Sequence, residues 1–167
     1  KRSAAELYDS FVNMQNQKLI PEHHFAVTAN VFVRRGVFND IGFFDEVQSG
    51  GDRTFGIKAF KAGYRTEYSS GVVVSHPVRS FRELAKKAYR TGYGSVFSRL
   101  SEGERLSFFG LVFVLLKRLL KPPSPFFWRS RIEEEGLDVG LLGCMNISFV
   151  MYIMNIIYVY SGICGYL

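Results

Sequence analysis

The sequence predicts an α/β chain that is followed by an interfacial helix and a transmembrane helix. Short runs rich in valine and aromatic residues, typical of strands, alternate with segments that carry helix start and stop signals. Residues 141–167 contain no charged side chain, and about 20 apolar residues are enough to cross a bilayer core as a helix. The 167 residues are sufficient for one domain with a core.

Four short segments are expected to form the strands. Residues 25–30 lead into a turn, 31–33 continue with strand formers, and 64–68 and 71–76 are two further strands. The stretch before them, 1–17, is expected to be the end of a polar helix or a loop.

Three helices are expected between and after these strands. The first is a short helix that begins within residues 34–38. The second, 52–62, has Gly63 as its stop signal. The third, 80–90, is basic and opens with a serine cap, and Glu83 stands where a capping box requires an acidic residue.

The last third of the chain predicts contact with a membrane. Residues 107–120 are apolar with a basic end, too short to span, and suit a helix in the interface plane that the prolines at 122, 123 and 125 stop. Residues 126–129 form an aromatic and basic anchor at headgroup level. Residues 141–167 are expected to span the bilayer, and the alternative is a buried core helix.

Charge supports a membrane setting. The net charge is +6, and residues 61–131 contain 14 basic and 4 acidic side chains. A basic stretch before a span indicates the cytoplasmic face, and it also suits anionic headgroups or a phosphorylated substrate. Nucleic acid is the weaker alternative, because no nucleic-acid motif is visible.

The two cysteines are not expected to form a disulfide with each other. Cys144 and Cys164 are about 30 Å apart along one helix and cannot pair within it.

Asp52 is the candidate catalytic residue. Gly50 and Gly51 precede it, allow a tight turn, and let a substrate approach the backbone. A carboxylate at the mouth of a helix is favoured in its ionised form and can take a proton from a sugar hydroxyl. The more ordinary alternative is that Asp52 is only a helix cap.

Three further positions suggest weaker hypotheses. His76 ends a valine run and could bind a divalent metal or a diphosphate, or simply its own backbone. Asn30 could project into a cleft or close a turn. Arg34 could contact phosphate or pair with a nearby aspartate. A basic helix face, either solvated or in contact with phosphate or membrane, is formed by Arg79, Arg82, Lys86, Lys87 and Arg90.

The order of these pieces resembles a known enzyme family. The motifs are Thr28-Ala29-Asn30-Val31-Phe32-Val33-Arg34-Arg35, Val37-Phe38, Ile41-Gly42-Phe43-Phe44-Asp45, Ser49-Gly50-Gly51-Asp52, Ala62-Gly63-Tyr64-Arg65, Tyr68 and Val74-Ser75-His76-Pro77. In this order and spacing the sequence resembles the C-terminal half of family 2 inverting glycosyltransferases, which have the glycosyltransferase-A fold. The resemblance covers roughly residues 25–94.

The resemblance implies roles for individual residues. Asp52 is similar to the family's catalytic base, although Gly51 stands where many members have a second acidic residue. His76 is similar to the histidine near the diphosphate and metal, and Asn30 and Arg34 lie where the family lines the sugar and acceptor cleft. The resemblance also implies a nucleotide-sugar donor, a polysaccharide or lipid-linked acceptor, and Mg²⁺ or Mn²⁺.

The family's Asp-x-Asp metal motif and its nucleotide-binding half are absent from these residues. We therefore expect an acceptor half of the transferase domain at 1–100, an interfacial helix and linker at 101–136, and a transmembrane helix at 137–167. The expected protein is a hexosyltransferase fragment that shows no turnover on its own. The alternative is a non-catalytic membrane-anchored remnant or assembly partner.

Overall fold

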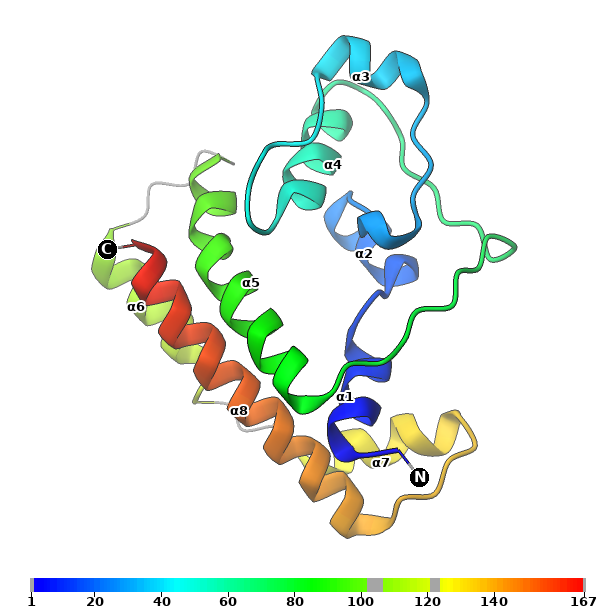
Figure 1. Ribbon diagram of the computed structural model, residues 1–167, viewed down its shortest axis with the longest axis vertical. Coiled ribbons are helices and arrows are strands. Elements are labelled where there is room, and N and C mark those ends of the chain that lie inside the picture. The colour runs from blue at the N-terminus through cyan, green and yellow to red at the C-terminus, as the bar shows by residue number, and fades with distance from the viewer. Residues whose placement is uncertain (1, 102–106, 121–123, 167) are drawn as a thin grey trace.

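The computed structural model describes residues 2–101, 107–120 and 124–166, and these residues form helices and irregular segments without a β-strand (Figure 1). The described helices are α1 (Ala4–Val12), α2 (Asn16–His23), the 3₁₀ helix η1 (Thr28–Asn30), α3 (Arg35–Ile41), α4 (Gly51–Lys61), α5 (Phe81–Ser101), α6 (Phe108–Lys117), α7 (Pro125–Glu134) and α8 (Gly140–Tyr166).

The α/β prediction, a partial glycosyltransferase-A sheet, is therefore wrong for the described residues. Strand-like backbone is present, since Val27 and Val31 are both extended, but no described segment forms a ladder with either. Phe32 is 86% exposed and Val73 81% exposed, so side chains that a packed sheet would cover face outward. A strand is stable only when a partner takes its backbone hydrogen bonds, and pattern alone does not supply that partner.

Helix α8 is the central helix of the fold, and the other long helix, α5, runs beside it in the same direction (Figure 1). Helices α1 and α7 cover its first half, and α6 covers its end. Three apolar clusters hold these helices together. Their buried members are Leu7, Phe11, Trp128, Ile132, Cys144 and Ile147, then Ala5, Leu84, Val150 and Met154, then Val96, Leu111 and Val159.

Helix α5 begins where the sequence predicts but runs eleven residues further than the expected end at 90. The Ser80 backbone N–H donates to the Glu83 carboxylate at 2.8 Å, one arm of the predicted capping box. Beyond residue 90 the helix contains Gly92, whose missing side chain lets α8 approach: an added Cβ would lie 2.1 Å from Ser161 Oγ. Packing on α8 thus sustains a helix through glycines that disfavour it.

Among the described residues, α8 alone is long and apolar enough to cross a membrane. Only 28% of its most apolar window is buried in the protein, which argues against the core-helix alternative. Its exposed large apolar side chains are Leu141, Leu142, Met145, Phe149, Ile156 and Tyr160. At 100° per residue these positions form a single stripe, opposite the face that α5 and α1 cover. We name it the apolar stripe.

A helix, α6, lies within the residues of the predicted interfacial helix; it buries Leu111 and leaves Phe109 83% exposed, and its place at a membrane interface stays a prediction. Two details of the prediction are wrong. Pro125 does not stop a helix but begins α7, a position that suits proline because its missing N–H is unpaired there anyway. Trp128 is 1% exposed and packs against α1, so it is a core residue rather than a headgroup anchor. The prolines at 122 and 123 lie outside the described residues.

Candidate active site

A turn fixed by Asp45 brings Asp52 to the start of α4. The Asp45 carboxylate accepts hydrogen bonds from Thr54 Oγ1 at 2.8 Å and Lys58 Nζ at 2.6 Å, both on α4. The hydrogen bonds from Lys58 and then Thr54 hold the pKa of Asp45 below its usual range. Gly50 takes the left-handed conformation at φ +90°, and the helix follows directly.

Asp52 lies in the first turn of α4, and the helix cap is Gly50, so the cap alternative does not hold. The Asp52 carboxylate is half-buried and accepts the Arg53 backbone N–H at 2.9 Å. An anionic side chain in this first turn is stabilised by the helix dipole. One oxygen of the Asp52 side chain is therefore anchored to the backbone at the start of α4.

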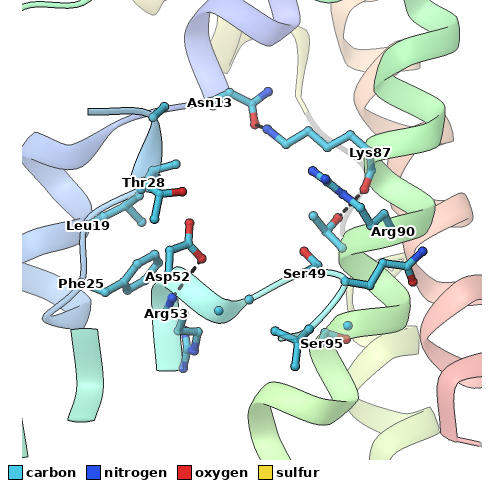
Figure 2. Close-up of a pocket in the computed structure, with 18 of the residues that line it drawn as sticks. Asn13, Leu19, Phe25, Thr28, Ser49, Asp52, Arg53, Lys87, Arg90 and Ser95 are labelled. Atoms are coloured by element: carbon cyan, nitrogen blue, oxygen red, sulfur yellow. Dashed lines mark hydrogen bonds between the residues drawn. The ribbon is translucent and has the colours of Figure 1, made fainter. Parts of the chain in front are cut away.

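The Asp52 carboxylate borders a cavity of about 850 Å³ (Figure 2). On one side are α4, the turn before it and the segment that runs through Phe25 and Thr28. On the other is α5. The polar side chains in the lining are Asn13, Thr28, Gln48, Ser49, Asp52, Arg53, Arg79, Lys87, Arg90, Thr91, Ser95, Arg99 and Tyr158. A cavity of this size can hold a substrate with several polar groups.

One face of α5 supplies the opposite wall. Lys87, Arg90, Thr91 and Ser95 recur at helical spacing, so they project in one direction. Between them, Gly94 lets the turn approach α5, because an added Cβ would lie 2.8 Å from Ser49 Cβ. Figure 2 shows Asp52 facing this wall from across the cavity.

The end of α1 borders the cavity and contacts two of the basic side chains that line it. Arg79 Nη1 lies 3.2 Å from Asp9 Oδ1, and Lys87 Nζ donates to Asn13 Oδ1. Burial, and next the Arg79 charge, lower the pKa of Lys87 to about 8, against the opposing effects of Asp9 and Asp52. The Lys87 ammonium therefore loses its proton at lower pH than an ordinary lysine does.

The predicted site residues divide into two groups. Gly50, Gly51 and Asp52 border the cavity. Asn30 is outside the lining, and its Nδ2 donates to the Val72 carbonyl at 2.9 Å, which ties two of the expected strands together.

Arg34 and His76 also lie outside the cavity lining. Arg34 is the exposed cap of α3, and the nearby Asp40 and Asp45 accept hydrogen bonds from Tyr64 and Lys58 respectively. His76 is exposed, with Nδ1 3.0 Å from the Pro77 carbonyl oxygen. No result here tests the roles predicted for any of these residues.

The described residues do not fit a metal ion by themselves. Nowhere among them do three histidine, cysteine, aspartate or glutamate side chains gather closely enough to bind one. His76 lies on an exposed segment and belongs to no such group among the described residues. No step of the chemistry below passes through a metal.

Sequence reasoning left out Asp9 and Asn13, and named Arg79, Lys87 and Arg90 only as part of a basic face. The helical spacing of α5 was a usable signal for Lys87 and Arg90. For Asp9, on a helix about 70 residues earlier in the chain, the sequence offered none.

Comparison with known proteins gives two matches. The family model described as glycosyl transferase family group 2 matches residues 2–165. The glycosyltransferase AglE of Haloferax volcanii is 40% identical over 126 residues, which cover 72% of this chain and 41% of the relative. The chain thus spans about two fifths of the length of this relative. No solved structure matches the chain.

Proposed function

The chain belongs to glycosyl transferase family group 2, and from this membership we propose that it transfers a sugar from a nucleotide-sugar donor to a polysaccharide or lipid-linked acceptor at a membrane. One observation carries the proposal: the Asp52 carboxylate faces a wall of cations across one cavity. Sugar transfer needs both, a base for the acceptor hydroxyl and positive charge for the departing diphosphate.

In the proposed reaction, Asp52 takes the proton of an acceptor hydroxyl while the hydroxyl oxygen attacks the anomeric carbon of the donor sugar. The bond from that carbon to the diphosphate breaks in the same displacement, so the configuration inverts. The position of Asp52 supports this role, since its carboxylate borders the open cavity and, among the described residues, one of its oxygens accepts a backbone N–H.

The cations that line the cavity suit the diphosphate that departs in this displacement. Arg79, Lys87 and Arg90 border the cavity together, and guanidinium and ammonium groups bind phosphate oxygens through charge-assisted hydrogen bonds. Negative charge grows on the diphosphate as it leaves, and fixed cations stabilise it without reorganising. Family members commonly use a divalent metal, Mg²⁺ or Mn²⁺ in our proposal, but the described residues do not fit one and we assign it no step.

The membrane part of the proposal is supported by α8. Its apolar stripe can face lipid while its opposite face packs on α5, the helix that carries the basic wall. The cavity also includes Tyr158 of α8, which brings the site beside the membrane helix. This neighbourhood suits an acceptor that is anchored in lipid, with the site on the cytoplasmic face.

The test is Asp52→Asn in the whole enzyme, with Glu46→Gln as the control. Loss of a general base lowers the transfer rate by about 10²- to 10⁴-fold, while donor binding persists. Glu46 is exposed on the same turn and outside the cavity, so its variant keeps wild-type transfer. Unchanged transfer by Asp52→Asn would remove Asp52 from the role of base. A wild-type enzyme that binds donor and never transfers would favour the non-catalytic assembly partner.

A further inference from the structure

Helix α1 carries a buried carboxylate that the proposed reaction does not use. Asp9 is 4% exposed and does not border the cavity. Its Oδ2 accepts the Arg79 backbone N–H at 2.9 Å, and Arg79 Nη1 lies 3.2 and 3.3 Å from its two oxygens. A carboxylate with this burial is costly unless it is paired, so the contact with Arg79 is a fixed part of the fold.

The same carboxylate reaches Lys87 through one intermediate side chain. Asn13 Nδ2 donates to Asp9 Oδ1, and Asn13 Oδ1 accepts from Lys87 Nζ. Both ends of the amide are used, which fixes its orientation. The path therefore runs from a buried anion to the cation that faces Asp52 across the cavity.

This network affects the protonation of Lys87. Burial, and next the charges of Arg79 and Arg90, lower the pKa of Lys87, and these effects favour a neutral amine. Asp9 and Asp52 are the charges that oppose them. Of these two, Asp52 borders the cavity and Asp9 does not, so Asp9 can act on Lys87 without occupying the cavity.

We infer that Asp9 and Asn13 are positioning residues. They hold Arg79 and Lys87 as two cations at the cavity wall, where both can bind the phosphates of a substrate. This inference rests on the proposed function only for the phosphate; the positioning itself rests on the contacts. Asp9 does not border the cavity and acts through the two cations, whereas Asn13 borders the cavity and positions Lys87 from there.

The first test measures the Lys87 ammonium itself. The full chain is methylated on its lysines with a ¹³C label, and Lys87→Arg identifies the Lys87 resonance. In the wild-type protein this resonance titrates with a pKa of about 8. In Asp9→Asn the titration moves to lower pH because an opposing anion is lost, and Asn13→Ala moves it the same way because an acceptor is lost.

The second test measures phosphate recognition, with inorganic pyrophosphate as the probe and calorimetry at pH 7. Asp9→Asn weakens binding by about tenfold or more, since two cations lose their support. Asn13→Ala has a smaller effect because the Asp9–Arg79 pair remains. Glu6→Gln is the matched control: it makes the same charge change on α1 at a partly exposed position, and glutamine still serves its capping box.

The two tests separate the possible failures. Asp9→Asn and Asn13→Ala proteins that titrate and bind like Glu6→Gln would overturn the positioning role. A wild-type protein that binds no pyrophosphate would overturn the phosphate site of the proposed function, while the Lys87 titration would still decide the positioning role. If Asp9→Asn does not fold, Asn13→Ala alone decides, because it leaves the buried ion pair in place.

Discussion

The contact of α5 with α8 at Gly92 gives the sharpest structural prediction. In Gly92→Ala, the new methyl group would lie 2.1 Å from Ser161 Oγ, 2.3 Å from the Tyr158 carbonyl oxygen and 2.9 Å from Tyr158 Cα. Two of these three atoms are backbone, so a rotamer change cannot remove the clash. The two helices must separate, and they do so along the apolar contacts that hold Leu84 and Val96 against α8.

Two opposing terms set the magnitude. Alanine is better than glycine inside a helix by about 1 kcal/mol. Overpacking costs about 1–3 kcal/mol, and a backbone clash belongs at the upper end, near 3 kcal/mol. We therefore expect Gly92→Ala to lower the free energy of unfolding by about 2 kcal/mol. For a chain of this size that loss lowers Tm by roughly 4–8 °C.

The assay is thermal and urea unfolding in mild detergent, followed by circular dichroism. Gly36→Ala is the control, because Gly36 lies in α3 and an added Cβ there meets no atom within 4 Å. That variant should be as stable as the wild-type protein or gain up to about 1 kcal/mol. If Gly92→Ala were as stable as Gly36→Ala, the close approach of α5 and α8 at this point would be refuted.

Two further predictions concern the turn and the membrane. The lowered pKa of Asp45 means that its contribution to stability is present above its ordinary pKa of 3.8 and is lost as pH falls further. Asp45→Asn should therefore flatten the decline in the free energy of unfolding between about pH 5 and pH 3; urea titrations that show the wild-type slope would contradict this. Phe149→Asp puts a charge in the apolar stripe, at a cost of up to about 3 kcal/mol in lipid, and should reduce co-flotation with liposomes. Phe32→Asp, at a phenylalanine just before α3 that is 86% exposed against 65% for Phe149, should float like wild type, and equal losses from both variants would refute a membrane role for the stripe.

Local signals in the sequence were sufficient for α4 and α8, whereas α2, α7 and the second half of α5 were not expected. Residues 52–62 were expected to be helical with a stop at Gly63, and α4 spans Gly51–Lys61 with Gly63 at φ +89°. The expected span at 141–167 corresponds to α8, Gly140–Tyr166. Caps, stop signals and long apolar runs act within a few residues of chain, so the sequence displays them directly.

Membership of a glycosyltransferase family was also within reach of the sequence, because ordered motifs such as Ser49-Gly50-Gly51-Asp52 are local strings. The pairing of strands was not within reach of the sequence. The extended segments near Val31 and Val72 carry strand-forming residues, yet in the described part of the chain no ladder forms. A strand depends on a partner elsewhere, and residue pattern does not contain that information.

The cavity was decided by tertiary structure alone. Asp9 and Arg79 are 70 residues apart, and Asn13 and Lys87 are 74 apart, yet each pair is in contact at the cavity that Asp52 borders. The sequence determined which side chains are charged and which segments are helical. Only the packing of α1 and α5 on α8 determined which charges meet, because the energy of a charge pair depends on its separation and burial, and both are set by the fold.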